Sequence, residues 1–506
     1  MALANFFEKI TLGISQILKG YNPSQMEAAL NSQRIGIFFD ENGANSKEGR
    51  STLDLVIRLV ARLFPVIQIE CSHSNQLVDD LKLLAKSINP VIEITESERP
   101  TVCIVVGKTA YSRSTDVFYL GSDNWIIGFS NSIPVGSSDS INPLGAGAAA
   151  CIGMANLFRY TFKEQLSYGT LDQDFSLSLL DYSLPASKNN LRLEKVNLGE
   201  SVVVGLGAVG NSFIWAISQM PLISGNLIII DPEKVSISNL QRYVLAKQSD
   251  IGINKTDLCS VALKESRLSI QSEGASWGEF INKRKEWDIQ TLVTCVDNIK
   301  DRIMMQGALP KKIFNAWTQP ENLGVSRHID FVEKPCLCCL YFPTVKKTSR
   351  SQEVADNLNL SNQEKIIRDY LANNKPVDEG LLHIIATANK VSVDYFLQYI
   401  GKSLDVFYSE VVCGGVLLKF NNSLSQQAGE SIAVPSAFES AFAGILLAAE
   451  LIKDKLNFPV TDFSVTTQFN LLRPLTKYLN IPETKRSFCI CSDSIFLQQY
   501  KTKWAE

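Results

Sequence analysis

The sequence has few of the residues on which several common functions depend. It contains only three histidines in 506 residues, so a histidine-based triad is poorly supported, and no protease or esterase motif is visible. The formal net charge of -3 provides no basic field for nucleic acid. No apolar run approaches the roughly 18 residues that a membrane-spanning helix needs. We therefore expect a protein that binds neither nucleic acid nor a membrane.

The N-terminal segment carries acidic and basic residues and does not read as a signal peptide. The 11 cysteines are therefore expected to be free thiols or metal ligands rather than disulfides, and the protein to be cytoplasmic. A chain of 506 residues with 45% hydrophobic residues predicts two or three globular domains.

The most informative segment is a glycine-rich loop in the middle of the chain. Residues 202–204 are a β-branched run, which predicts a buried parallel strand. A GxGxxG pattern follows, made of Gly205, Gly207 and Gly210. The first glycine permits a tight turn, the second lets backbone approach a phosphate, and the third lets a helix over residues 211–220 pack on the sheet. The loop predicts nucleotide binding; a turn without ligand is the alternative.

The polar residues that follow favour ATP over a nicotinamide cofactor. Asp231 ends the next apolar strand, at the spacing where a carboxylate can bind ribose hydroxyls. Asn239, Arg242 and Lys255 follow within one βα unit, and cations near strand ends can neutralise phosphates. Asp297 ends another apolar run, TLVTCVD, where a carboxylate can hold Mg²⁺. Hydride transfer needs no such cations, although each residue alone could be a solvated surface residue.

The same residues carry a family resemblance. SNLQR resembles the SNLNRQ segment of the ThiF, MoeB and E1 ubiquitin-activating family, DIGINK its D-x-G-x-x-K segment, and CVDN its C-x-D-N/A segment. The resemblance implies a Rossmann-like α/β adenylation domain in which Asp231 binds ribose. It further implies that Asn239, Arg242 and Lys255 contact the phosphates. By the same resemblance, Asp297 holds Mg²⁺.

The resemblance covers about residues 190–506 and has one visible departure. Tyr243 stands after the arginine, where the family usually has glutamine. No role of that glutamine can therefore be carried over to this chain.

Five cysteines form a second pattern: Cys336, Cys338 and Cys339 in KPCLCCLYFP, and Cys489 and Cys491 in FCICSD. Thiolates two or three residues apart on a tight turn can share one tetrahedral Zn²⁺, and two such turns close a structural site. Buried apolar cysteines are the alternative. PCLCCLYFP is similar to the PCxxC-x-FP zinc segment of the family, which favours Cys336, Cys339, Cys489 and Cys491 as ligands. Cys338 could replace one of them.

Cys413 stands apart, after an apolar run and before two glycines, which would let a substrate backbone approach. From the local sequence alone, a buried strand cysteine is the better reading. In the family, the zinc segment is followed by a cysteine, a crossover segment and a helix of the form GxxxAxExxK; here these are Cys413, residues 421–431 and a helix ending at Lys453. The resemblance implies that Cys413 accepts the acyl group, and an acyl adenylate is reactive enough for a thiolate.

A helical insertion of about residues 346–415 follows the zinc segment at Cys336 and Cys339, and its range includes Cys413. It resembles the cysteine domains of ubiquitin-type E1 enzymes and is a place where a carrier protein could dock. A surface insertion without a role in the reaction is the alternative.

The N-terminal half has α/β patterning but no complete glycine loop. Apolar runs predict four strands and a helix, at residues 34–40, 63–71, 101–107, 124–130 and 52–64. The sequence of residues 142–162 resembles that of residues 434–453, since both read as helices rich in small residues that end in bulkier apolar residues and a cation. We therefore expect residues 1–185 to be a degenerate, inactive adenylation-like domain, joined by a polar linker at residues 181–192 to an active domain at residues 190–506.

The functional expectation is an E1-like enzyme, similar to those of bacterial ubiquitin-like conjugation systems in antiphage operons. It would use ATP and Mg²⁺ to adenylate the C-terminal glycine of a ubiquitin-like protein, form a thioester on Cys413 and pass it to an E2-like protein. Zn²⁺ would be structural, and a homodimer is compatible with the resemblance. The nearer alternative is a sulfur-carrier or peptide adenylyltransferase without thioester transfer; the farther one is a scaffold or a dehydrogenase.

Overall fold

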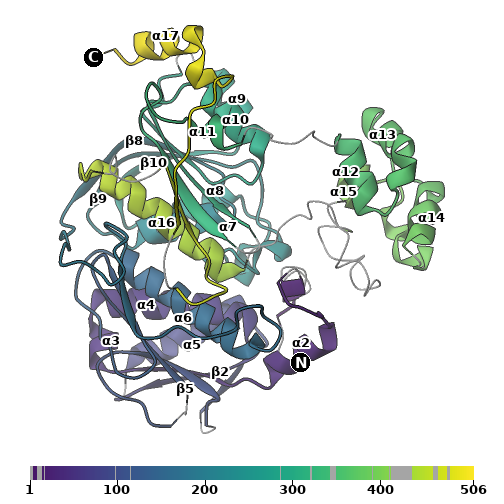
Figure 1. Cartoon of the computed structure of the whole chain (residues 1–506). Coiled ribbons are helices and arrows are strands. Elements are labelled where there is room, and N and C mark those ends of the chain that lie inside the picture. The colour runs from purple at the N-terminus through teal and green to yellow at the C-terminus, as the bar shows by residue number, and fades with distance from the viewer. Residues whose placement is uncertain are drawn as a thin grey trace.

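The computed structural model describes most of the chain: residues 4–7, 14–15, 17–73, 75–96, 99–113, 116–284, 287–319, 322–341, 349–389, 391–408, 411, 436–459, 465–475 and 479–505. These residues form two mixed sheets flanked by helices, and a helical unit that stands to one side of them (Figure 1).

The first sheet has seven strands in the order β3-β2-β1-β4-β5-β6-β7. Neighbours from β3 to β5 are parallel, and β6 and β7 are antiparallel additions. The strands are β1 (Ile35–Phe39), β2 (Val66–Cys71), β3 (Glu93–Thr95), β4 (Val102–Val106), β5 (Asp116–Asp123), β6 (Ile126–Ser130) and β7 (Phe175–Ser178). The helices are α2 (Pro23–Asn31), α3 (Glu41–Asn45), α4 (Lys47–Leu63), α5 (Gln76–Ile88) and α6 (Leu144–Phe162).

The second sheet has eight strands in the order β10-β9-β8-β11-β12-β13-β14-β15. Its strands are β8 (Val196–Val204), β9 (Ile223–Ile230), β10 (Arg267–Glu273), β11 (Thr291–Thr294), β12 (Lys312–Thr318), β13 (Leu323–His328), β14 (Thr466–Phe469) and β15 (Leu479–Ile481). Its helices are α7 (Ala208–Ser218), α8 (Lys255–Leu263), α9 (Trp277–Lys283), α10 (Ile299–Gly307), α11 (Leu337–Leu340), α16 (Ala437–Lys455) and α17 (Ser494–Lys503).

The second sheet repeats the topology of the first. Strands β8 to β14 take the places of β1 to β7 in order, and the change from parallel to antiparallel pairing comes at the same step. Helices α6 and α16, which contain the two echoing sequence segments, occupy equivalent places between the sixth and seventh strands of each repeat. The predicted duplication of the adenylation fold is therefore confirmed.

The repeats meet through these two helices, which lie side by side between the sheets in Figure 1. The rings of Phe158 and Phe438 are 5.6 Å apart. A Cβ at Gly147 would come within 2.9 Å of Ile445 and 2.6 Å of Trp215, so this small residue allows the close approach. Small residues on α6 thus bring the first repeat against the second one.

The first repeat carries a carboxylate where the second has its glycine loop. Asp40 follows β1 directly, as Gly205 follows β8. The Asp40 side chain accepts hydrogen bonds from the backbone N–H groups of Gly43 (3.1 Å) and Lys108 (2.7 Å) and caps α3. A negative side chain therefore occupies the helix N-terminus at which a phosphate would otherwise bind.

The helical insertion has a hydrophobic core of its own. It comprises α12 (Arg350–Asn357), α13 (Glu364–Ala372), α14 (Glu379–Ala388) and α15 (Leu404–Tyr408). The polar first part of the insertion is helical as well, because α12 and α13 bury residues such as Val354 and Ile367. Cys413 and the predicted crossover at residues 421–431 lie outside the described residues.

The four strands and the helix predicted in the N-terminal half are present as β1, β2, β4, β6 and α4, whereas β3, β5 and β7 were not predicted. The polar linker is anchored rather than free. Tyr182 is fully buried and donates a hydrogen bond to Glu450, and the carbonyl of Leu191 accepts one from Trp125 (2.7 Å).

Among the described residues, no helix is both long and apolar enough to span a membrane.

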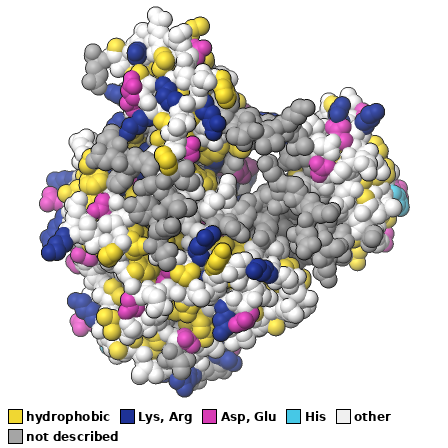
Figure 2. Space-filling model, in the orientation of Figure 1, with side chains coloured by type: hydrophobic (Ala, Val, Ile, Leu, Met, Phe, Trp, Pro, Cys, Tyr) yellow, Lys and Arg dark blue, Asp and Glu magenta, His cyan; other side chains and the backbone are white. Residues whose placement is uncertain are grey.

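Charge is mixed on the outside of the molecule. On the face shown in Figure 2, basic and acidic side chains are interspersed, and no broad patch of one sign is present there. This mixed distribution agrees with the formal net charge of -3.

Candidate functional site

The glycine loop has the geometry that phosphate binding requires. Gly205 has a φ of +88°, and a Cβ there would come within 2.9 Å of Val296. A Cβ at Gly210 would lie 2.0 Å from the carbonyl oxygen of Gly205, so neither position tolerates a side chain. Gly207 is the N-cap of α7 and provides no side-chain cap. The first N–H groups of α7 are therefore available to an anion.

Asp231 at the end of β9 holds this loop in place. Its side chain is buried and accepts hydrogen bonds from the backbone N–H of Leu206 (2.7 Å) and of Glu233 (2.9 Å). Burial raises its pKa, although Lys255 acts in the opposite direction. The structure thus gives Asp231 a positioning role beside the ribose contact expected from the sequence.

Lys255, the first residue of α8, lies beside Asp231 and is itself buried. Its Nζ forms an ion pair with Glu233 and lies 3.7 Å from Asp231 Oδ1. Burial alone would lower the pKa of Lys255, but Tyr243, Asp231 and Glu233 outweigh it and the net pKa is raised. A permanent positive charge is thus fixed next to the glycine loop. Glu233 was not singled out from the sequence, because only the fold pairs it with Lys255.

Tyr243, the residue that departs from the family pattern, is part of the same site. The side chain is buried, and Lys255 Nζ lies 5.3 Å from the centre of its ring. Its hydroxyl oxygen is 3.6 Å from the position that a Cβ would take on Gly207. The tyrosine therefore fills the space between the glycine loop and the lysine.

Asn239 and Arg242 lie on the segment that leads to Tyr243. The Asn239 side chain accepts a hydrogen bond from the backbone N–H of Ser236 (2.9 Å) and closes the short helix η1 (Ile237–Asn239). Arg242 is half-buried, and its side chain forms no hydrogen bond or ion pair with any other residue that the structure describes. Its guanidinium is thus available to a ligand.

Asp297 is exposed on the turn between β11 and α10. Burial, and then the nearby Asp297 carboxylate, raise the pKa of Asp301. The turn is held by Arg302, which donates to the carbonyl of Val296 (2.5 Å) and to the hydroxyl of Tyr341 (2.6 Å). Since Val296 also contacts the glycine loop, Asp297 lies near the phosphate site, where a carboxylate could hold Mg²⁺.

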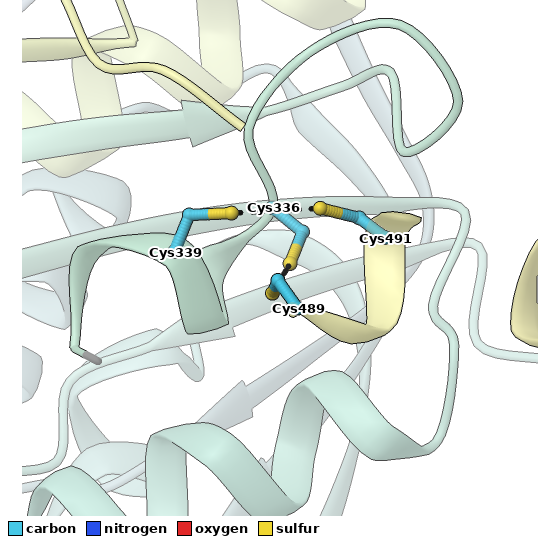
Figure 3. A group of neighbouring side chains, drawn as sticks. All are labelled: Cys336, Cys339, Cys489 and Cys491. Carbon is cyan, nitrogen blue, oxygen red and sulfur yellow. Dashed lines mark hydrogen bonds between the residues drawn. The ribbon is translucent and has the colours of Figure 1, made fainter. Parts of the chain in front are cut away.

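The four predicted zinc ligands converge on one point (Figure 3). Sγ of Cys336 lies 3.5 Å from that of Cys489, and Sγ of Cys339 lies 3.5 Å from that of Cys491. All four sulfur atoms lie within 4.8 Å of one another and all four residues are buried. A tetrahedral Zn²⁺ with Zn–S bonds of about 2.3 Å separates its sulfur ligands by roughly 3.8 Å. The cluster could therefore bind zinc.

Cys338 is not one of the four clustered ligands, although its thiol interacts with those of Cys336 and Cys489. Its Sγ faces the backbone carbonyl of Ile303 on α10, 3.9 Å away. The neighbouring Leu337 donates from its N–H to Gln306 on the same helix (2.8 Å). The short helix α11 therefore joins the cysteine cluster to α10, the helix that follows Asp297.

Together, the duplicated fold and the glycine loop with its fixed lysine define a nucleotide-binding α/β enzyme. Residues 184–491 match the model of the ThiF family, and the chain belongs to that family. It is an ATP-dependent adenylating enzyme, as expected from the sequence, and not a dehydrogenase. Residues 38–163 match the model described as Prokaryotic E2 family C, a match that was not predicted.

The chain is also similar to individual proteins. The uncharacterized protein y4jF of Sinorhizobium fredii is 39% identical over 510 residues, which span 100% of this chain and 98% of that protein. Among solved structures, E. coli MccB with MccA-N7isoASN is 16% identical with a TM-score of 0.37, over 58% of this chain and 67% of that one. E. coli MccB with AMPCPP and MccA is 16% identical with a TM-score of 0.34, over 56% and 65%.

Proposed function

We propose that this protein is an E1-like enzyme that adenylates the C-terminal glycine of a ubiquitin-like protein and carries it as a thioester. The observation that supports the adenylation step is the buried Lys255 beside the glycine loop. Arg242, on the segment that leads to Tyr243, adds a second cation whose side chain forms no hydrogen bond or ion pair with a described residue. The match of residues 38–163 to a prokaryotic E2 family suggests a ubiquitin-like conjugation context. Bacterial antiphage defence is the biological setting that we propose.

In the first step, an oxygen of the glycine carboxylate attacks the α-phosphorus of ATP. The bond from that phosphorus to the oxygen bridging to the β-phosphate breaks, and pyrophosphate leaves with both electrons. Lys255 and Arg242 stabilise the negative charge that develops on the phosphates, since fixed cations act most strongly where charge appears. Glu233 is 70% exposed and can turn away from Lys255 when the phosphates enter. Mg²⁺ held by Asp297 would neutralise phosphate charge further.

In the second step, the thiolate of Cys413 attacks the carbonyl carbon of the acyl adenylate. The bond from this carbon to the AMP oxygen breaks, AMP leaves, and a thioester remains on Cys413. The thiol of an E2-like protein then takes the acyl group by exchange. AMP is a good leaving group, so a thiolate suffices although no histidine stands near Cys413 in the sequence.

A covalent adduct tests the thioester step. Full-length protein, Mg·ATP and a small β-grasp protein ending in glycine are mixed and separated on gels with and without thiol reductant. We expect a reductant-sensitive adduct in the wild type and in Cys71→Ala, a partly exposed cysteine of the first sheet. Cys413→Ser should lose the adduct, or form a reductant-resistant ester in its place.

An unchanged reductant-sensitive adduct in Cys413→Ser would remove Cys413 from the mechanism. Carrier-dependent ATP–pyrophosphate exchange without any adduct in the wild type would instead favour a sulfur-carrier or peptide adenylyltransferase, which needs no acyl-accepting thiol.

A further inference from the structure

We propose that the inactive first repeat positions the phosphate-binding segment of the second repeat through a polar stripe on α4. The stripe consists of Asp54, Arg58 and Arg62, and the segment is residues 239–246, which include Arg242 and Tyr243. This inference rests on the proposed function, because it assigns the stripe to the ATP site. The stripe residues are positioning residues and do not touch the nucleotide themselves.

The stripe lies on one face of α4, because its members are four residues apart. Oδ2 of Asp54 accepts hydrogen bonds from Arg58 Nε (2.8 Å) and from Trp215 Nε1 (2.8 Å). Trp215 belongs to α7, the helix that begins at the glycine loop. The stripe is therefore attached to one of the elements that build the nucleotide site.

Arg58 and Arg62 bind the backbone of the segment itself. Arg58 Nη1 donates to the carbonyl of Val244 (2.9 Å). Arg62 Nη2 donates to the carbonyls of Tyr243 (2.5 Å) and Ala246 (2.7 Å) and reaches that of Val244 at 3.3 Å. The two guanidinium groups thus engage consecutive carbonyls immediately after Arg242.

Arg62 makes these bonds at an energetic cost. It is 1% exposed, and no carboxylate among the described residues forms an ion pair with it. Burial, and then repulsion from Arg58, lower its pKa to about 9. A buried cation without a carboxylate partner is unfavourable unless several acceptors converge on it. Here the acceptors are the carbonyls of the segment, which would lose their donors if Arg62 were removed.

The opposite side of the segment is held by the active repeat. The N–H of Leu245 donates to Asn211 on α7 (2.7 Å), and that of Tyr243 donates to the carbonyl of Asn239 (3.0 Å). The segment is therefore clamped between α4 and α7. This clamp fixes the backbone of Tyr243, whose hydroxyl lies beside Gly207, and of the neighbouring Arg242.

The affinity for Mg·ATP tests this inference without any carrier protein. Full-length wild type, Arg62→Ala, Arg62→Lys and Arg50→Ala are compared by calorimetric titration, with hydrogen exchange of the amides at residues 239–246 as a second readout. We expect Arg62→Ala to raise the Kd about tenfold and to accelerate exchange in this segment. Lysine lacks the planar fork and should restore only part of the affinity.

Arg50→Ala is the matched control, since Arg50 lies on the same helix and donates to the carbonyl of Ala44 within its own repeat (2.7 Å). It should leave both readouts unchanged. If Arg62→Ala does not fold, Arg58→Gln replaces it, with a smaller rise in Kd expected. Wild-type affinity for Mg·ATP and wild-type amide exchange in these variants would overturn this inference but not the proposed function. A wild type that binds no Mg·ATP would overturn the proposed function as well.

Discussion

Glu439 is a buried acid whose charge state bears on the stability of the protein. It lies in the first turn of α16, where one carboxyl oxygen accepts from the N–H of Ser436 (3.0 Å) and the other has no hydrogen-bond partner. Burial raises its pKa from 4.5 to about 8. The side chain is therefore largely protonated in the folded protein at neutral pH.

The raised pKa of Glu439 predicts a loss of stability with rising pH. Between pH 4.5 and about 8 the unfolded chain releases a proton that the folded chain retains. The stabilisation is complete below this window and is lost as pH rises through it. Glu439→Gln should match the wild type near pH 4.5 and exceed it at pH 8 by a few kcal/mol, on the order of 1.4 kcal/mol per pH unit, in urea unfolding.

Glu279→Gln is the control for this experiment. Glu279 closes the same kind of capping box, with Ser276 on α9, but it is exposed and its pKa is lowered by hydrogen bonds from Ser276. Its substitution should give no gain in stability at pH 8. A difference in the free energy of unfolding between Glu439→Gln and the wild type that does not change with pH would contradict a raised pKa of Glu439.

At the scale of single residues, the sequence was informative where function depends on consecutive positions. The glycine loop and Asp231 could be recognised because their spacing reflects one strand–helix–strand unit. Glu233 and Tyr243 could not be assigned to the site in this way. Their roles depend on where α8 and the 239–246 segment fold back on the loop, and neither residue type is unusual at the surface of a protein.

At the scale of elements, α11 and the short helix η10 (Ile490–Ser492) present the four cysteines to one another. We expect about one Zn²⁺ per chain by atomic emission, since four thiolates close a tetrahedral site. Cys339→Ser should lose most of this zinc and lower the melting temperature. Its neighbour Cys338 faces Ile303, so Cys338→Ser should retain the metal.

Two results would argue against this zinc site. One is a metal-free wild type purified without chelator; the other is equal zinc loss in the Cys338 and Cys339 variants. The sequence alone left Cys338 open as a ligand. Adjacent cysteines on one helical turn differ only in the direction of their side chains, and this direction is set by the packing of α11 on α10.

Strands were predictable where they are buried on both faces. β4 is an uninterrupted apolar run and is buried at every position, as is usual for the interior of a parallel sheet. β5 was missed, because its sequence, DVFYLGSD, has polar ends and an internal glycine. Helices α12 and α13 of the insertion bury only a few apolar residues each, so their apolar pattern in the sequence is weak.

At the scale of the whole molecule, the chain is a fused pair of related folds in which only one glycine loop is intact. A short echo between two small-residue helices indicated this duplication, and the matching strand orders confirm it. The contacts between the repeats could not be predicted. Arg62 and Tyr243 are 181 residues apart in sequence, and no local pattern links an arginine in one helix to carbonyl groups in a distant turn.

We propose that ATP is used at the Lys255 site to activate a protein C-terminus. The most direct test is ATP–pyrophosphate exchange with Mg·ATP and a small β-grasp protein ending in glycine, in the wild type, Lys255→Ala and Lys264→Ala. Lys264 is an exposed lysine at the other end of α8. We expect carrier-dependent exchange in the wild type and in Lys264→Ala, and a loss of about 100-fold or more in Lys255→Ala. Exchange at the wild-type rate in Lys255→Ala, or none in the wild type with any such carrier, would contradict the claim.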